Sequence, residues 1–85
     1  MDNKNLNRLK VVLAEKGLSN KWLAEQLGTT QATVSKWVTN TSQPSLETLM
    51  QIAKILEVQV DGLLRFEVLP VIEKVEVHET TKAVQ

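Results

Sequence analysis

Four neighbouring residues of this chain have side chains that could bind the base edges and phosphates of nucleic acid. Gln31, Ala32, Ser35 and Lys36 share one face of a helical pattern. A glutamine can form two hydrogen bonds with adenine, a lysine can bind guanine or phosphate, and an alanine can contact a thymine methyl group. None of the four is acidic, so this face would not repel DNA. We predict that Gln31, Ala32 and Lys36 contact bases; the alternative is that they are merely solvated, as most exposed glutamines and lysines are.

A helix predicted over residues 20–27 would support this face from behind. Leu23, Ala24 and Leu27 lie on one side of it, and the small Ala24 allows a neighbouring helix to approach closely. Gly28 follows, and glycine adopts a positive φ at little cost. The chain is therefore expected to turn sharply at Gly28.

A second short helix, over residues 30–39, is expected to carry the polar face. The hydroxyl of Thr30 can cap it by accepting a hydrogen bond from the backbone near Thr33, and Val34 and Trp37 recur at a spacing that anchors it inward. Two such helices joined by a tight turn form a helix-turn-helix, which presents its second helix to the major groove of DNA.

The chain resembles the lambda-repressor-like family of phage and bacterial repressors, the Cro/CI or XRE type. The resemblance runs without gaps over about residues 5–64 and rests on five sequence blocks in register. The blocks are residues 17–19 (Gly-Leu-Ser), 23–28 (Leu-Ala-Glu-Gln-Leu-Gly), 33–37 (Thr-Val-Ser-Lys-Trp), 44–49 (Pro-Ser-Leu-Glu-Thr-Leu) and 52–54 (Ile-Ala-Lys). The resemblance implies an all-α fold, a compact five-helix domain that binds DNA, usually as a dimer.

Contacts with the DNA backbone are expected from the resemblance and from side-chain chemistry. The family places a phosphate-binding residue where this chain has Asn20, at the start of a helix, and helix N-termini favour anions in any case. Uncharged donors, Gln43 among them, lie along the second helix and the loop after it, where they could equally be ordinary helix and loop composition. The predicted phosphate contacts are Asn20, Thr30, Thr33, Ser35, Thr39, Thr41 and Ser42.

Three further helices are expected around the motif. The first covers residues 5–16, a later one is capped by Ser45, and a short fifth helix covers residues 60–64. The fifth is expected to be marginal, because Gln59 is a poor cap and Gly62 costs about 1 kcal/mol inside a helix. The residues expected to be buried are Leu6, Leu9, Val12, Leu13, Leu46, Leu49, Ile52, Ala53, Leu56, Val58, Leu63 and Leu64.

Four residues depart from the pattern of the family. Leu13 and Val38 stand where many members have an arginine and a glutamate that pair across two helices, and exchanging both partners for packed apolar residues is often neutral or stabilising. Asn40 stands where a glycine is common, and asparagine tolerates the left-handed conformation next best. Trp22 stands where a solvated acid is common. We expect it to pack over a helix junction, because large aromatic residues usually bury most of their surface; the alternative is contact with a partner.

The composition contains no recognisable catalytic or metal-binding cluster. The 85 residues include no cysteine, and the only histidine, His78, has no second ligand near it in the sequence. There is no paired nucleophile and base, so we predict no enzyme activity, no metal and no cofactor. The N-terminus has no apolar run of signal or membrane length, which leads us to expect a cytoplasmic protein that does not contact membranes.

The net charge of zero conceals an uneven distribution of charge along the chain. Residues 1–45 include six basic and three acidic residues, a net charge of +3. Residues 46–85 include four basic and seven acidic residues, a net charge of −3. The half that contains the predicted DNA-binding helix is thus the half that attracts phosphate, and the acidic half is expected to face away.

The chain is expected to divide into a DNA-binding domain over residues 1–66 and a C-terminal tail over residues 67–85. Residues 71–77 alternate in a strand-like period that Glu73 interrupts, and residues 79–85 are expected to be disordered. A lone strand is not stable, so residues 71–77 would pair with a second copy, pair with another protein, or remain flexible.

These observations favour a sequence-specific transcriptional regulator, acting as a homodimer on an inverted repeat in double-stranded DNA. The alternative is an antitoxin or anti-regulator whose C-terminal tail binds a protein partner, with DNA binding secondary or lost. The zero net charge and the unexplained tail support this alternative.

Overall fold

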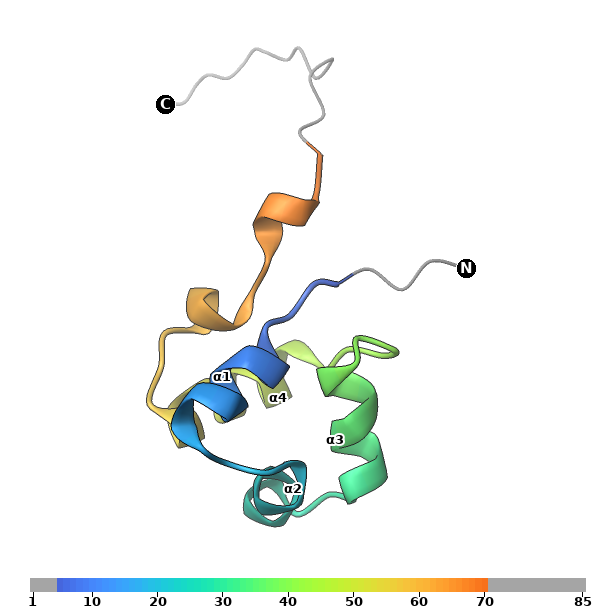
Figure 1. The fold of residues 1–85 in the computed structure, drawn as a ribbon, viewed down its shortest axis with the longest axis vertical. Helices are drawn as coiled ribbons and strands as arrows, with labels where there is room; N and C mark the ends of the chain where they lie inside the picture. The colour runs from blue at the N-terminus through green and yellow to red at the C-terminus, as the bar shows by residue number, and fades with distance from the viewer. Residues whose placement is uncertain (1–4, 71–85) are drawn as a thin grey trace.

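Four short α-helices and two 3-10 turns make up the part of the chain that the computed structural model describes, residues 5–70. The helices are α1 (Leu9–Lys16), α2 (Asn20–Leu27), α3 (Gln31–Val38) and α4 (Leu46–Leu56), followed by the turns η1 (Val60–Leu63) and η2 (Phe66–Val68). Figure 1 shows that the chain leaves the group of helices after η1 and carries η2 away from it. Within residues 5–70 there is no β-strand, and no helix there is long and apolar enough to span a membrane.

Hydroxyl side chains cap the start of three of the four helices. Each hydroxyl oxygen accepts a hydrogen bond from the backbone N–H three residues further on, at 3.0 to 3.1 Å. Such a cap satisfies a donor that the first helical turn leaves unpaired and stabilises the helix by about 1 kcal/mol. The capping pairs are Ser19 with Trp22, Thr30 with Thr33, and Ser45 with Thr48. The predicted caps Thr30 and Ser45 are confirmed.

Left-handed backbone conformations mark the ends of the helices. Gly28 has a φ of 71° at the turn between α2 and α3, as the helix-turn-helix requires, and Asn40 has a φ of 60° just after α3. Both conformations were expected from the sequence. Glu57 adopts the same conformation after α4, with a φ of 58°, although glutamate is not a residue that favours it.

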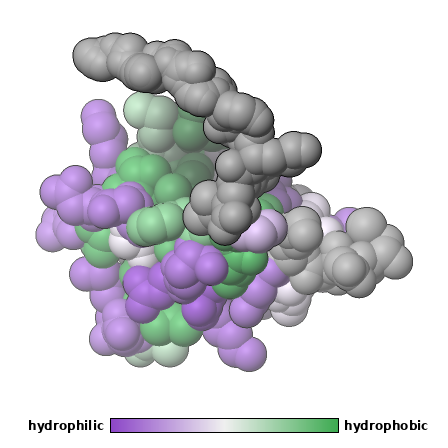
Figure 2. Space-filling view, turned by 90° about the horizontal axis from the view of Figure 1, so that it is seen from above, coloured by the Kyte–Doolittle hydropathy of each residue, from purple (hydrophilic) through white to green (hydrophobic). Residues whose placement is uncertain are grey.

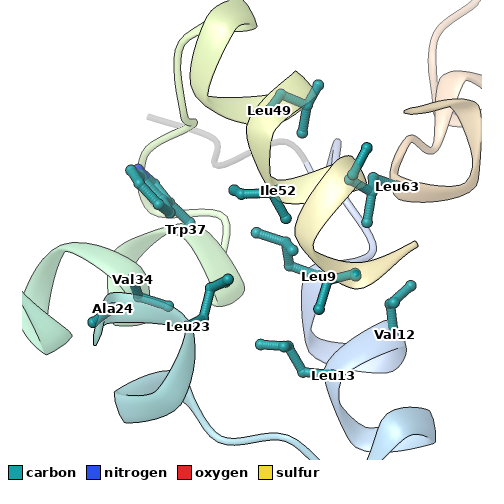
Figure 3. Close-up of a cluster of buried hydrophobic side chains, with 12 residues drawn as sticks. Leu9, Val12, Leu13, Leu23, Ala24, Val34, Trp37, Leu49, Ile52 and Leu63 are labelled. Carbon is teal, nitrogen blue, oxygen red and sulfur yellow. The ribbon is translucent and has the colours of Figure 1, made fainter. Parts of the chain in front are cut away.

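One hydrophobic core joins the four helices to η1, as Figure 3 shows. Each element contributes a side chain that is completely buried: Leu9 from α1, Leu23 from α2, Val34 from α3, Ile52 from α4 and Leu63 from η1. The other buried members are Val12, Leu13, Ala24, Trp37, Leu49, Ala53 and Leu56. Val34 and Trp37 of α3 belong to this core, and α3 contacts α1 as well as α2, so its orientation is not set by α2 alone.

Three of the residues that depart from the family pattern lie where packing was expected. Leu13 is buried in the core, and Val38 is partly buried against it. Trp22 is also partly buried and packs against the core, which agrees with the packing interpretation of this residue. Leu13 and Val38 thus serve as packed apolar side chains, as expected for both.

The start of the first helix was predicted wrongly. α1 begins at Leu9, not at residue 5, because the backbone before it is hydrogen-bonded to the segment after η1. The N–H of Arg8 donates to the carbonyl of Leu63 (2.9 Å), and the N–H of Arg65 donates to the carbonyl of Leu6 (2.7 Å). An isolated antiparallel bridge between Asn7 and Leu64 forms there.

Two further predictions about the fold need correction. Leu46, expected in the buried stripe of α4, is 71% exposed, because it lies in the first turn of the helix, ahead of the buried residues that follow from Leu49. The fifth helix is only the 3-10 turn η1, in keeping with Gln59, which forms no side-chain cap. The predicted strand over residues 71–77 and His78 lie outside the described residues.

Candidate nucleic-acid interface

α3 exposes a short polar face on a helix that is otherwise held in the core. Gln31, Ala32 and Lys36, the predicted base contacts, are exposed together, whereas Val34 and Trp37 on the other side are buried. Lys36 is the only charged residue of the helix, and no acid occurs in its first turn. The exposed face therefore carries positive charge and hydrogen-bonding groups with nothing to repel phosphate.

The position of these residues along α3 also suits insertion into a groove. Gln31 and Ala32 are the first two residues of the helix, and Lys36 follows about one turn later. Helices of this type contact base edges with their N-terminal residues. The same end of the helix carries the positive end of the helix dipole, which favours an approach to DNA phosphates.

The hydroxyls of Thr30 and Thr33 form a pair at the start of α3. Thr30 Oγ1 accepts the capping hydrogen bond from the Thr33 N–H (3.1 Å), and the two Oγ1 atoms lie 2.9 Å apart. Since one hydroxyl donates to the other, one of the two O–H groups remains available. This pair can therefore donate one hydrogen bond to a phosphate, and the contacts of Thr30 and Thr33 with the DNA backbone stay a prediction.

The hydroxyls at the other end of α3 are already engaged. Thr39 Oγ1 donates to the carbonyls of Ser35 (3.0 Å) and Lys36 (3.2 Å), and it lies 2.8 Å from Thr41 Oγ1. A hydroxyl has one proton, so Thr39 must accept from Thr41 while it donates to the helix. Both threonines would have to give up these hydrogen bonds to donate to phosphate. Within the described part of the chain, the Ser42 hydroxyl has no such engagement.

Asn20 at the start of α2 lies next to Ser35 in the middle of α3. The side-chain amide Nδ2 of Asn20 is 3.4 Å from Ser35 Oγ, and both residues are half-buried. The structure thus brings together two of the predicted phosphate contacts that are 15 positions apart in the sequence. Asn20 keeps a second amide N–H for a ligand, next to the N-terminus of α2.

A buried amide network, which sequence reasoning missed, fixes the end of α3 and the loop after it. Asn40 is 6% exposed, and its Oδ1 accepts hydrogen bonds from the Asn7 N–H (2.9 Å) and from Gln43 Nε2 (2.9 Å). Its Nδ2 donates to Asn5 Oδ1 (2.8 Å) and to the Asn7 carbonyl (3.2 Å). Asn40 is therefore required for more than its backbone conformation.

Asn7 completes this network from the segment before α1. It is 4% exposed, and its Nδ2 donates to the Trp37 carbonyl (2.9 Å) and to Gln43 Oε1 (2.7 Å). Its Oδ1 accepts from the N–H of Leu9, the first residue of α1 (3.0 Å). Both polar ends of the Gln43 amide are thus bound within the protein. Nothing in the local sequence around Asn7 distinguishes it from an exposed loop asparagine.

The chain belongs to the family of the Cro/C1-type HTH (helix-turn-helix) DNA-binding domain, whose model matches residues 8–68. The resemblance inferred from the sequence blocks is thereby confirmed, as is the all-α helix-turn-helix fold. Within residues 5–70, no group of three or more histidine, cysteine, aspartate or glutamate residues could hold a metal ion.

Among solved structures, the chain is similar to a protein from Bacteroides fragilis whose crystal structure is described as that of a "putative DNA-binding protein". The two chains are 52% identical, the match covers 71% of this chain and 97% of that chain, and the TM-score is 0.70. No curated protein matches the chain.

Proposed function

We propose that this protein is a sequence-specific transcriptional regulator and that α3 enters the major groove of double-stranded DNA. The observation that carries the proposal is the exposed face of Gln31, Ala32 and Lys36 on a helix whose opposite side is buried in the core. Gln31 would bind an adenine edge, Ala32 a thymine methyl group, and Lys36 a guanine or a phosphate. Membership of a DNA-binding family supports the same conclusion.

We propose further that the protein acts as a homodimer on an inverted repeat. One domain covers only a half-site, and two such domains bind with their major-groove helices about 34 Å apart along the duplex. An apolar surface available for pairing lies where the chain leaves the core, with Phe66 71% exposed, Leu69 48% and Val68 44%. Figure 2 looks onto this end of the molecule and shows hydrophobic residues bordered by hydrophilic ones.

The same exposed apolar residues favour a second candidate, an antitoxin or anti-regulator that binds another protein through its C-terminal tail. Selection of bound sequences from a random DNA pool distinguishes the two functions. An enriched inverted repeat supports the dimeric regulator, and an enriched single half-site supports a regulator that binds as a monomer. The absence of any enrichment would contradict a sequence-specific regulator and leave the protein-binding role.

Gln31→Ala is expected to lower the affinity for the preferred DNA site while affinity for random duplex stays nearly unchanged. A bidentate base contact provides about 1 to 3 kcal/mol of discrimination, which corresponds to a loss of about 5- to 150-fold. Fluorescence anisotropy titrations on both duplexes measure the two losses. Gln51→Ala is the matched control, because Gln51 is an exposed glutamine on α4. Equal losses on both duplexes would show that Gln31 does not bind a base.

Lys36→Ala and Asn20→Ala are expected to differ in their effect on the salt dependence of binding. Loss of a charged phosphate contact should reduce the slope of log affinity against log salt by about one unit, whereas loss of a neutral contact should leave it unchanged. Lys54→Ala on α4 is the control for a surface charge outside the interface. An unchanged slope with altered base preference would assign Lys36 to a base instead, and no effect at all would exclude Lys36 from the interface.

A further inference from the structure

A hollow of about 360 Å³ lies where the start of α1 meets the end of α3. It is lined by Arg8 just before α1, by Lys10 in the first turn of α1, by Thr39 and Asn40 just after α3, and by Arg65 after η1. We call it the basic hollow, because none of its lining residues in the described part of the chain is acidic. It is separate from the face of Gln31, Ala32 and Lys36, none of which lines it.

The concentration of positive charge here is high for this protein. Residues 5–70 contain seven basic and six acidic residues, and three of the seven basic residues border this hollow. Arg8 Nη1 donates to the carbonyl of Gly62 (2.7 Å), which fixes its guanidinium while leaving other N–H groups for a ligand. Lys10 is exposed at the mouth of the hollow and is free to move toward a bound group.

Arg65 offers a hydrogen-bond donor that the protein itself does not satisfy. Its backbone N–H is bound to the carbonyl of Leu6, but its side-chain Nε is buried and has no hydrogen-bond partner. Buried donors are almost always paired, so an orphaned guanidinium N–H requires an explanation. An anion is the acceptor that a guanidinium binds most strongly, and phosphate matches its geometry well.

The helix ends at the hollow also accommodate an anion. The first turn of α1 contains no acid, and the only side chain that caps it is the uncharged Asn7, whose Oδ1 accepts from the N–H of Leu9, so no negative charge offsets the positive end of the helix dipole in the described part of the chain. The last carbonyls of α3, which would repel an anion, are already bound: Lys36 O accepts from the N–H of Thr41 (2.8 Å) and Trp37 O from the N–H of Asn40 (3.0 Å). The α1 side of the hollow therefore favours an anion, and hydrogen bonds to these two carbonyls reduce the repulsion from the end of α3.

We propose that the basic hollow binds a phosphate group through Lys10 and Arg65, with Arg8 held beside them. Of the phosphate contacts predicted for α2, α3 and the following loop, only Thr39 borders this site. Two sources share this chemistry: a phosphate of the DNA backbone outside the segment that α3 contacts, or a free phosphate ester in solution. The two sources are distinguished by testing binding with and without DNA.

The first arm of the test titrates inorganic phosphate into the full-length chain without DNA. Millimolar phosphate is expected to shift the NMR signals of Thr39, Asn40 and the Arg65 Nε–H saturably, whereas chloride at equal ionic strength does not. Lys10→Gln should weaken phosphate binding at least about tenfold, since one charge-assisted hydrogen bond contributes about 1.5 to 3 kcal/mol. Lys10 is exposed, so this variant should fold normally, and Lys54→Gln is the matched control.

The second arm measures the salt dependence of DNA binding for the same variants. If the phosphate belongs to DNA, Lys10→Gln reduces the salt slope by about one unit and Lys54→Gln does not. If the phosphate is free in solution, Lys10→Gln weakens phosphate binding at least about tenfold and leaves the salt slope of DNA binding unchanged. The proposal is overturned if Lys10→Gln alters neither phosphate binding nor the salt slope. The phosphate arm involves no DNA, so its result is independent of the proposed regulatory function.

Discussion

Removal of residues 67–85 is expected to weaken binding to an inverted-repeat duplex by about 10²- to 10⁴-fold, the advantage that linking two binding modules typically provides. The deletion takes away the exposed side chains of Val68 and Leu69 together with the rest of the tail. If these residues hold two copies together, each domain would then bind its half-site alone. Titrations on an inverted repeat and on a single half-site, with light scattering for the mass, measure the effect.

The truncated protein should remain folded, because the described core ends with Leu63 and the partly buried Leu64. The half-site duplex serves as the control, and its affinity should stay within about twofold, because surface changes away from a contact rarely exceed about 0.5 kcal/mol. A truncated protein that still dimerises and binds the inverted repeat normally would make partner binding the better account of the tail.

Asn40→Gly is expected to lower the free energy of unfolding by about 1 to 3 kcal/mol, although glycine suits a φ of 60° better than asparagine does. The substitution removes the acceptor of the buried Asn7 N–H and the donor to the Asn7 carbonyl, and leaving buried groups unpaired has a cost of this size. Urea denaturation followed by circular dichroism gives the free energy directly.

Glu57→Gly is the matched variant for this measurement. Glu57 has nearly the same backbone conformation, with a φ of 58°, but its side chain is exposed. Here only the backbone strain is relieved, so the free energy of unfolding should rise by up to about 1 kcal/mol. If both variants were stabilised alike, the amide network would contribute nothing, and Asn40 would matter only for its backbone.

The elements of the helix-turn-helix could be predicted because their signals are local. Thr30 and Ser45 cap their helices through hydrogen bonds to residues three positions on, and Gly28 turns the chain by its own conformational freedom. The buried stripes repeat at the helical period, so Val34 and Trp37 were placed correctly. None of these inferences needs knowledge of a distant part of the chain.

The features that escaped prediction depend on contacts between distant residues. α1 begins late because the segment before it pairs with the backbone near Leu63, more than 50 positions away along the chain. Asn7 looks like a surface asparagine until Asn40, 33 positions later, is placed beside it. Leu46 fits the apolar period of α4, but the burial of a side chain in the first turn depends on whether another part of the chain packs against it, and Leu46 is exposed.

For the candidate site, the sequence indicates which groups could bind DNA but not which of them are free to do so. The three predicted base contacts are exposed, as the pattern required. The hydroxyls of Thr39 and Thr41 are instead occupied by each other and by α3. Such mutual engagement depends on side-chain orientation after a helix has ended, which no sequence period reports. The basic side chains of Arg8, Lys10 and Arg65 also come together at the basic hollow in a way that no sequence period reports.

The separation of the two faces of α3 has a consequence for how such a protein can evolve. Its inner residues Val34 and Trp37 maintain the fold, while Gln31, Ala32 and Lys36 take no part in the core or in the helix caps. Substitutions at those three exposed positions should therefore change the folding free energy by no more than about 0.5 kcal/mol. If α3 binds DNA as proposed, descendants of this sequence would acquire new DNA-site preferences by single exchanges at these positions, without compensating mutations elsewhere in the fold.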